Sequence, residues 1–228
     1  MSQRMLVTFN GGSSTVKLGL FALEGDRARR IGKGMIDFRK PPLRFHLLEG
    51  PDTFDVALEA DPGAELHDVF GEAFRRLSWH YDMDRLAAAG HRIVHGGDTF
   101  AGPIPLNDAA LETLQALTPL APLHQPQGLR LVRAVSRLRP GLLQIASFDT
   151  AFHRSQPALA QQFALPRELT AEGVRRYGFH GLSYDYVMTH LRETEPALAG
   201  SRLIVAHLGN GASLCAISDG RSVASTMG

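Results

Sequence analysis

Alternating apolar and polar positions mark the beginning of the chain as β-structure. Apolar side chains occupy every second position over residues 5–9 and again over residues 15–23, and a third strand is expected over residues 31–38. A polar turn with the sequence NGGSS, residues 10–14, joins the first two strands. The pattern predicts a hairpin with an unusually polar tip, followed by an irregular stretch that begins at Pro41.

Helical spacing replaces this alternation further along the chain. Apolar residues recur three and four positions apart over residues 64–80, which predicts an amphipathic helix with one buried face. Helices are also expected over residues 107–117, with Asn107 as the N-cap, and from Pro126 onward. Short strands are expected over residues 91–95 and 142–148. Three strands followed by alternating helices and strands predict an α/β fold with a mixed sheet flanked by helices.

The hairpin pattern occurs a second time near the end of the sequence. Residues 203–217 (LIVAHLGNGASLCAI) are similar to residues 6–20 (LVTFNGGSSTVKLGL) under a shift of 198 positions, which places Val16 on Leu214. We interpret this similarity as one fold unit used twice. A third strand of the second copy begins near Arg221, so the second sheet should leave apolar surface and a strand edge exposed.

The repeat also suggests how the chain is divided. We expect an N-terminal domain over residues 1–150, with the first glycine turn, and the start of a second domain over residues 151–228.

Composition and charge narrow the possible partners. The 228 residues are 44% hydrophobic, and 24 Lys and Arg against 23 Asp and Glu leave a net charge of +1 without a long block of like charge. This favours a small-molecule partner over a nucleic acid or a membrane surface. Without an apolar run typical of a signal peptide or a membrane span, a cytoplasmic location is expected. The single cysteine, Cys215, is interpreted as a small buried side chain.

The two glycine turns are candidate phosphate-binding loops. Turns such as 10–14 (NGGSS) and 209–211 (GNG) allow backbone N–H groups and serine hydroxyls to approach phosphate oxygens. A tight hairpin needs the same residues for its geometry alone, so one such turn is weak evidence. Two turns in equivalent places of a repeat are stronger evidence. The sequence contains neither the Walker A spacing nor the dinucleotide motif G-x-G-x-x-G, so the phosphate site is expected to be of another type.

The segment at 91–95 carries the candidate residues for binding a small acid. On a strand, Arg92 and Val94 would share one face, and a guanidinium beside a small apolar wall suits a short carboxylic acid. A surface arginine next to a core valine fits the same pattern. His91 and His95 have the spacing of a helical metal pair, but the β-branched residues and the following glycines favour a strand, so no zinc site is expected.

Two further polar residues occupy positions typical of active sites. Asp149 follows the apolar strand 142–148, where a carboxylate can hold a metal, orient a nucleophile, accept a proton or simply cap a turn. His180 is followed by Gly181 in a loop that would fix its imidazole. It can donate to the oxygens of a phosphoryl group, although a purely structural histidine fits equally well.

Six short motifs occur in order along the chain, and together they resemble the acetate kinase family. They are NGGSST at 10–15, HRIVHGG at 91–97, APLHQP at 121–126, FDTAFH at 148–153, YGFHGLS at 177–183 and HLGNGAS at 207–213. The resemblance extends over residues 5–228. It implies duplicated ribonuclease-H-like units of the actin/Hsc70 type, the second incomplete, and a homodimer. It also implies a reversible, Mg²⁺-dependent phosphorylation of acetate by ATP, which yields ADP and acetyl phosphate.

The resemblance further implies roles for individual residues. As catalytic residues it indicates Asp149, Arg92 and His180. As substrate-binding residues it indicates Arg92, Val94 and Leu123. As nucleotide- or phosphate-binding residues it indicates Asn10, Ser14, Lys17, His207, Gly209, Asn210 and Gly211. Asn10 is also the candidate ligand for Mg²⁺.

The family sequence continues where this one ends, with a further arginine, an adenosine-binding loop and a glutamate that holds Mg²⁺. We therefore expect the chain to be a fragment with an incomplete ATP site and with little activity by itself. Two alternatives stay open. One is a propionate or butyrate kinase of the same family, because one methylene changes binding by only about 1–3 kcal/mol. The other is a non-catalytic acetate-binding module.

Overall fold

A computed structural model describes residues 4–12, 14–39, 41–61 and 63–228 of the chain. It contains two compact units, which are described separately. The N-unit comprises Met1–Ile93 and Ile104–Ala146, and the C-unit comprises Val94–Pro103 and Ser147–Gly228. The expected domain boundary at residue 150 stays a prediction.

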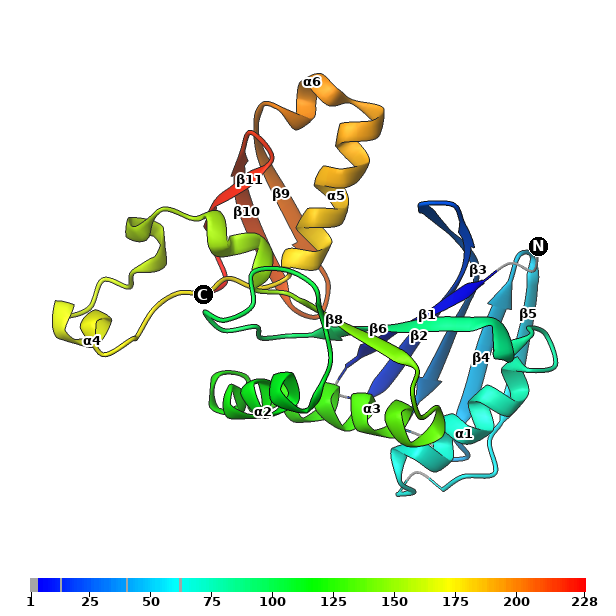
Figure 1. The fold of residues 1–228 in the computed structure, drawn as a ribbon. Helices are drawn as coiled ribbons and strands as arrows, with labels where there is room; N and C mark the ends of the chain where they lie inside the picture. The colour runs from blue at the N-terminus through cyan, green and yellow to red at the C-terminus, as the bar shows by residue number, and fades with distance from the viewer. Residues whose placement is uncertain (1–3, 13, 40, 62) are drawn as a thin grey trace. The chain divides into compact units, whose positions relative to one another are not determined.

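The N-unit is built around an eight-stranded mixed sheet with the order β5-β4-β3-β2-β1-β6-β8-β7 (Figure 1). Neighbouring strands from β1 to β5 are antiparallel, whereas β1 and β6 are parallel. The strands are β1 Met5–Gly11, β2 Thr15–Glu24, β3 Arg27–Asp37, β4 Arg44–Glu49, β5 Asp52–Ala57, β6 Leu86–Ile93, β7 Ile104–Pro105 and β8 Leu143–Phe148. The three expected N-terminal strands are therefore confirmed.

Helices α1 and α3 pack against each other, and α3 also contacts β1 and β6 (Figure 1). The buried face of β1 meets α1 through Phe9, whose ring contacts that of Phe70 edge-on at 5.7 Å between centroids. Asn107 caps α2 as expected, because its side chain accepts a hydrogen bond from the backbone N–H of Ala110. The helices of the N-unit are α1 Leu66–Leu77, α2 Asp108–Ala116 and α3 Gln125–Leu138, with the 3₁₀ turns η1 Met83–Arg85 and η2 Thr118–Leu120.

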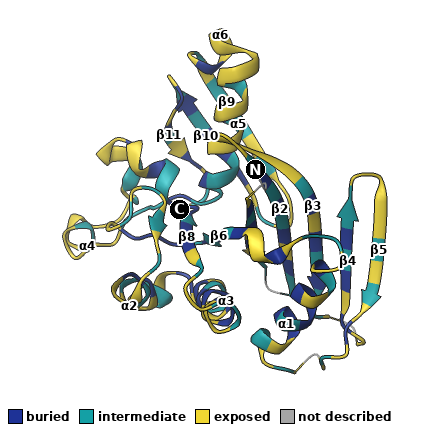
Figure 2. Ribbon diagram, turned by 45° about the vertical axis from the view of Figure 1, so that its right-hand side comes forward, coloured by how far each residue is buried: buried dark blue, intermediate teal, exposed yellow. Residues whose placement is uncertain are grey.

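The expectation of an irregular stretch after Pro41 is wrong. Strands β4 and β5 form a hairpin there, and β4 pairs with β3 at the sheet edge. Phe45 and Leu47 of β4 are buried, whereas most of β5 is exposed (Figure 2). An edge strand with one solvent-exposed face and polar residues at alternate positions resembles a loop in sequence, which explains why an irregular stretch was expected.

The expected strand 91–95 is also placed wrongly, because β6 begins at Leu86 and ends at Ile93. Its first half consists largely of alanine and glycine, which have low β-propensity, so the alternation does not reveal it. Val94 lies in a bend beyond the strand, and the expected sharing of one strand face by Arg92 and Val94 is therefore not observed.

The C-unit contains a three-stranded antiparallel sheet with the order β11-β10-β9. One face packs against helix α5 through a small core that includes Tyr184, Met188 and Ile217. Cys215 belongs to this core and is fully buried, as expected. The elements are η3 Ala151–Ser155, η4 Ala158–Gln161, α4 Arg167–Ala171, α5 Gly181–Thr194, α6 Pro196–Ala199, β9 Arg202–Leu208, β10 Ala212–Ser218 and β11 Arg221–Ser225.

Strands β9, β10 and β11 repeat the antiparallel arrangement of β1, β2 and β3, but the register corrects the sequence alignment. Val7 pairs with Leu20 in the first hairpin, whereas Val205 pairs with Cys215 in the second. The shift of 198 positions therefore holds only for the first strand of each hairpin, because Val205 and Cys215 are 10 positions apart in the sequence whereas Val7 and Leu20 are 13 apart. An odd displacement reverses the faces of a strand, so Leu214 is 43% exposed although Val16, its partner in the alignment, is 7% exposed.

The second face of the C-unit sheet is exposed, as the sequence led us to expect. Ile204 and Leu208 of β9 are 76% and 79% exposed. Within the described parts of the chain, no helix has both the length and the apolar character needed to cross a membrane.

Candidate active site

In the N-unit, three polar residues predicted to bind phosphate or substrate occupy adjacent strands. Asn10 of β1 pairs with Lys17 of β2. On the other side of β1, Phe9 pairs with His91 of the parallel strand β6, and Arg92 is the next residue of β6. The ring of Phe9 stacks on that of His91 in the core at 5.2 Å between centroids, so Asn10 and Arg92 point to the opposite face. Arg92 Nη1 donates a hydrogen bond to Asn10 Oδ1 at 3.0 Å.

This arrangement makes the carboxyl ends of β1 and β6 a candidate ligand site. The ends of parallel strands meet at one edge of a sheet, which is the usual place for ligands in α/β folds. The cationic groups of Lys17 and Arg92 stand on either side of Asn10 in the strand order. They can attract an anion such as a carboxylate or a phosphate.

The first glycine turn lies beside a cavity of about 270 Å³. Gly12 donates its N–H to the carbonyl oxygen of Thr15 at 2.7 Å. The backbone carbonyl oxygen of the half-buried Ser14 accepts from the N–H of Phe38 at 2.9 Å. Gly11, Gly12 and Ser14 line the cavity together with Gln127 and Arg130 of α3. The sequence does not single out either of these α3 residues, because a polar residue on a helix carries no sign of its tertiary neighbours. Ser13, the remaining serine of the turn, lies outside the described residues.

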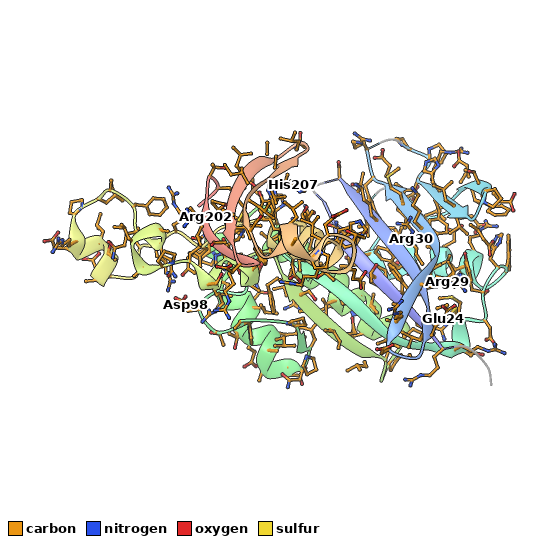
Figure 3. The ribbon with its side chains drawn as sticks, turned by 90° about the horizontal axis from the view of Figure 1, so that it is seen from above. Glu24, Arg29, Arg30, Asp98, Arg202 and His207 are labelled. Carbon is orange, nitrogen blue, oxygen red and sulfur yellow. The ribbon has the colours of Figure 1, made fainter. Side chains whose placement is uncertain are left out.

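In the C-unit, two of the predicted histidines are brought together. The rings of His180 and His207 stack with 4.1 Å between their centroids and 26° between their planes. His180 comes from the loop before α5. His207 lies on β9, where Figure 3 labels it. Each Nδ1 atom shares a hydrogen bond with a serine hydroxyl, that of Ser213 for His180 at 2.8 Å and that of Ser183 for His207 at 3.0 Å.

These serine contacts turn the Nε2 edges of both rings toward the second glycine turn. A Cβ atom added at Gly211 would lie 3.3 Å from His180 Nε2, and one added at Gly209 would lie 3.8 Å from His207 Nε2. The exposed Asn210 lies between these two glycines. Two imidazole edges and a glycine turn therefore form one polar surface, which can donate hydrogen bonds to an oxyanion. The two serines were missed, although both belong to motifs that carry the family resemblance.

Asp149 is linked to the same loop through its backbone. It follows β8, its side chain is 1% exposed, and its carbonyl oxygen accepts a hydrogen bond from the N–H of Gly181 at 2.9 Å. A Cβ atom at position 181 would lie only 2.1 Å from that oxygen, so this close approach requires glycine.

The two residues expected to line a methyl pocket lie in different units. Val94 is half-buried in the C-unit, whereas Leu123 belongs to the N-unit and is 75% exposed. Their role in binding an alkyl group stays a prediction.

The described residues contain no cluster of three or more His, Cys, Asp or Glu side chains that could hold a metal ion. Mg²⁺ commonly takes only one or two protein carboxylates together with substrate phosphates, so the carboxylate of Asp149 fits such a site. Asn10 fits it less well, because its Oδ1 atom already accepts from the guanidinium of Arg92. A second cation on the same oxygen would be repelled.

Comparison with known proteins assigns the chain to a family. The family model described as Acetokinase family matches residues 5–228. The acetate kinase of Methylocella silvestris is 43% identical over 99% of this chain and 58% of its own length. A propionate kinase structure from Francisella tularensis superposes with a TM-score of 0.87 at 33% identity, covering 100% of this chain and 58% of that one. For Porphyromonas gingivalis acetate kinase the TM-score is 0.82 at 33% identity, with 99% and 57% covered.

These matches confirm the α/β fold of the acetate and propionate kinases, which is of the actin type. The chain spans a little over half of the length of these relatives. Because the family match extends over almost all of its residues, the chain belongs to the acetokinase family.

Proposed function

We propose that this chain supplies the acid-binding and phosphoryl-transfer residues of an acetate kinase, which forms acetyl phosphate and ADP from acetate and ATP. The observation that supports this most directly is the hydrogen bond between Arg92 and Asn10, which joins the expected acid-binding residue to the first phosphate turn. Since the chain spans little more than half of the length of its relatives, the activity of the whole protein is part of the proposal.

In this reaction a carboxylate oxygen of acetate attacks the γ-phosphorus of ATP, the bond from that phosphorus to the β–γ bridging oxygen breaks, and ADP leaves. Acetate is already ionised at neutral pH, so no general base is needed to activate it. Among the roles considered for Asp149, orienting the substrate and holding Mg²⁺ are therefore favoured over accepting a proton. Bound Mg²⁺ would neutralise charge on the phosphates.

The protein groups then act by position and charge, which account for most of the catalysis in phosphoryl transfer. Arg92 would bind the carboxylate or the phosphoryl group, and Lys17 would add positive charge beside the first turn. His180 and His207 would donate from their Nε2 edges to phosphoryl oxygens near the turn 209–211.

The proposal can be tested by trapping acetyl phosphate with hydroxylamine. One sample is the 228-residue chain, and the other is the same chain extended with the remaining C-terminal residues of the Methylocella silvestris relative. We expect slow turnover by the chain alone and Mg²⁺-dependent turnover at a kinase-like rate, roughly 1–100 s⁻¹, by the extended protein. A rate in that range from the chain alone would contradict the expectation that its ATP site is incomplete.

Propionate and butyrate, assayed alongside acetate, test the alternative substrates. The similarity to a structure titled propionate kinase makes propionate the second candidate. A higher kcat/KM for propionate than for acetate would favour that reading. A folded extended protein that binds acetate but turns over none of the three acids would favour the non-catalytic module. Mg²⁺ dependence, a homodimer and a cytoplasmic location stay predictions.

A further inference from the structure

His180 adopts a backbone conformation that needs support from its surroundings. Its φ angle is +61°, in the left-handed region, which costs a residue other than glycine about 1–2 kcal/mol. The residue is also the N-cap of α5, but within the part of the chain that the structure describes its side chain makes no capping hydrogen bond. The direction of its imidazole therefore depends both on the hydrogen bond to Ser213 and on how the peptide groups on either side are held.

Two hydrogen bonds hold these peptide groups, and both come from the segment that follows β8. On one side, the N–H of Gly181 donates to the carbonyl oxygen of Asp149 at 2.9 Å. On the other side, Nε2 of His153 lies 2.8 Å from the carbonyl oxygen of Phe179. A carbonyl oxygen can only accept, so His153 carries its proton on Nε2 and donates it.

The opposite edge of the His153 ring is equally well defined. Its Nδ1 atom lies 2.8 Å from the hydroxyl of Ser222 on β11, and the same hydroxyl lies 3.1 Å from Gln156 Nε2 and 3.3 Å from Cys215 Sγ. Burial lowers the pKa of His153, which is 1% exposed, and so favours the neutral ring that accepts from Ser222 while donating to Phe179.

Close packing adds to these contacts. A Cβ atom at Gly178, where φ is +81°, would lie 2.5 Å from Cγ of His153, so the loop lies directly against the imidazole. The ring of His153 thus fills the space between the sheet residue Ser222 and the loop that carries His180. Neither the family resemblance nor the spacing of its motif assigns a role to this histidine.

We propose that His153 is a positioning residue for His180. Its neutral imidazole links β11 to the peptide that precedes His180, and it thereby directs the Nε2 edge of His180 toward the glycine turn 209–211. The consequence for catalysis rests on the proposed function, whereas the consequence for loop geometry does not.

Two substitutions of His153 separate the effect of its hydrogen-bond donor from the effect of its ring volume. A glutamine at position 153 can place an amide N–H near the position of Nε2, whereas an asparagine reaches only as far as Nδ1. In the 228-residue chain, we expect His153→Asn to raise the hydrogen-exchange rate of the Gly181 amide by at least about tenfold, and His153→Gln to change it by less than about threefold. Amides of the β9–β10 hairpin, which lies in the same unit as Gly181, provide the internal reference for folding.

Ser222→Ala is the milder variant, because it leaves the imidazole in place and removes the hydroxyl from its Nδ1 atom, while Gln156 Nε2 remains 3.3 Å from that atom. It should raise the exchange rate of Gly181 less than His153→Asn does, and it keeps the test decisive if the asparagine variant fails to fold. Exchange at Gly181 that stays at the wild-type rate in the folded variants, His153→Asn or Ser222→Ala, would overturn the proposal.

Kinetics of the extended protein provide the second readout. His153→Asn should lower kcat by about 10–100-fold, the usual effect of losing a group that orients an active-site residue, while the KM for acetate changes by less than threefold. His153→Gln should recover most of kcat. If His153→Asn speeds exchange at Gly181 but leaves kcat unchanged, the positioning of His180 by His153 is supported and the proposed role of His180 in the reaction is contradicted. Absence of turnover in the unsubstituted protein would count against the proposed function alone.

Discussion

Replacing Arg92 by alanine is expected to lower kcat/KM for acetate by about 100-fold or more in the extended protein. The guanidinium can form two parallel hydrogen bonds to a carboxylate or phosphoryl group, and no other side chain reproduces this geometry. Its hydrogen bond to Asn10 fixes the arginine at the end of β6, so the positive charge is already in place before the substrate binds. Hydroxamate formation at several acetate concentrations measures the loss.

Arg92→Lys retains the charge but not the fork, and we expect it to recover only part of the activity. Arg85→Ala is the matched control, because Arg85 lies just before β6 and pairs with Asp82 on the surface. It should have little effect on kcat/KM. An unchanged kcat/KM in Arg92→Ala would exclude Arg92 from the acid-binding site.

The second large effect is a loss of stability in acid, caused by His91. This residue is 2% exposed, and burial lowers its pKa to about 4. Its Nε2 atom lies 2.7 Å from Gln144 Oε1, and Gln144 Nε2 in turn donates to Ser136 Oγ, so the amide orientation makes Oε1 the acceptor and His91 the donor. Nδ1 has no hydrogen-bond partner among the described residues, and protonating it would bury an unsatisfied charged donor.

The sign of the effect follows from the lowered pKa. In the unfolded chain His91 binds a proton near its ordinary pKa of 6.5, whereas in the folded N-unit its pKa is only about 4. The contribution of His91 to the free energy of unfolding is therefore fully present above pH 6.5 and is lost as the pH falls toward 4. A shift of this size corresponds to about 3 kcal/mol in the free energy of unfolding.

His91→Gln provides the comparison, because glutamine stays neutral at every pH. We expect the unfolding free energy of the wild-type chain to fall by about 3 kcal/mol more than that of His91→Gln between pH 7 and pH 4. Urea unfolding followed by fluorescence suits the measurement, since the only tryptophan, Trp79, lies in the same unit as His91. Equal pH dependence in the two proteins would contradict the assigned pKa of His91.

The first hairpin and helix α2 could be predicted because their patterns are strong and local. Alternation over β1 and β2 and the capping side chain of Asn107 each depend on a few neighbouring residues. The hairpin β4–β5 and the first half of β6 could not be predicted in the same way. Partner strands rather than their own residues stabilise them, and alanine, glycine and proline conceal the alternation.

The residues of the candidate site could likewise be predicted, whereas the contacts between them could not. The resemblance indicated Arg92, Asn10, His180 and His207 as separate residues, without indicating which of them touch. The contact between Asn10 and Arg92 depends on the parallel pairing of β1 with β6, whose members lie more than 80 positions apart in the sequence. His153 carried no signal by itself, because its role consists of contacts with Phe179 and Ser222.

The sequence by itself determined the family, the repeated hairpin and the chemical types available for binding an anion, because motifs and periodicity are properties of residues close together in the chain. Only the tertiary structure decided the three-residue difference between the two hairpins, the stacking of His180 on His207 and the support of the His180 loop by His153. These features depend on strand register and side-chain packing between distant segments, and a shift of one residue would place every side chain of a strand on the other face.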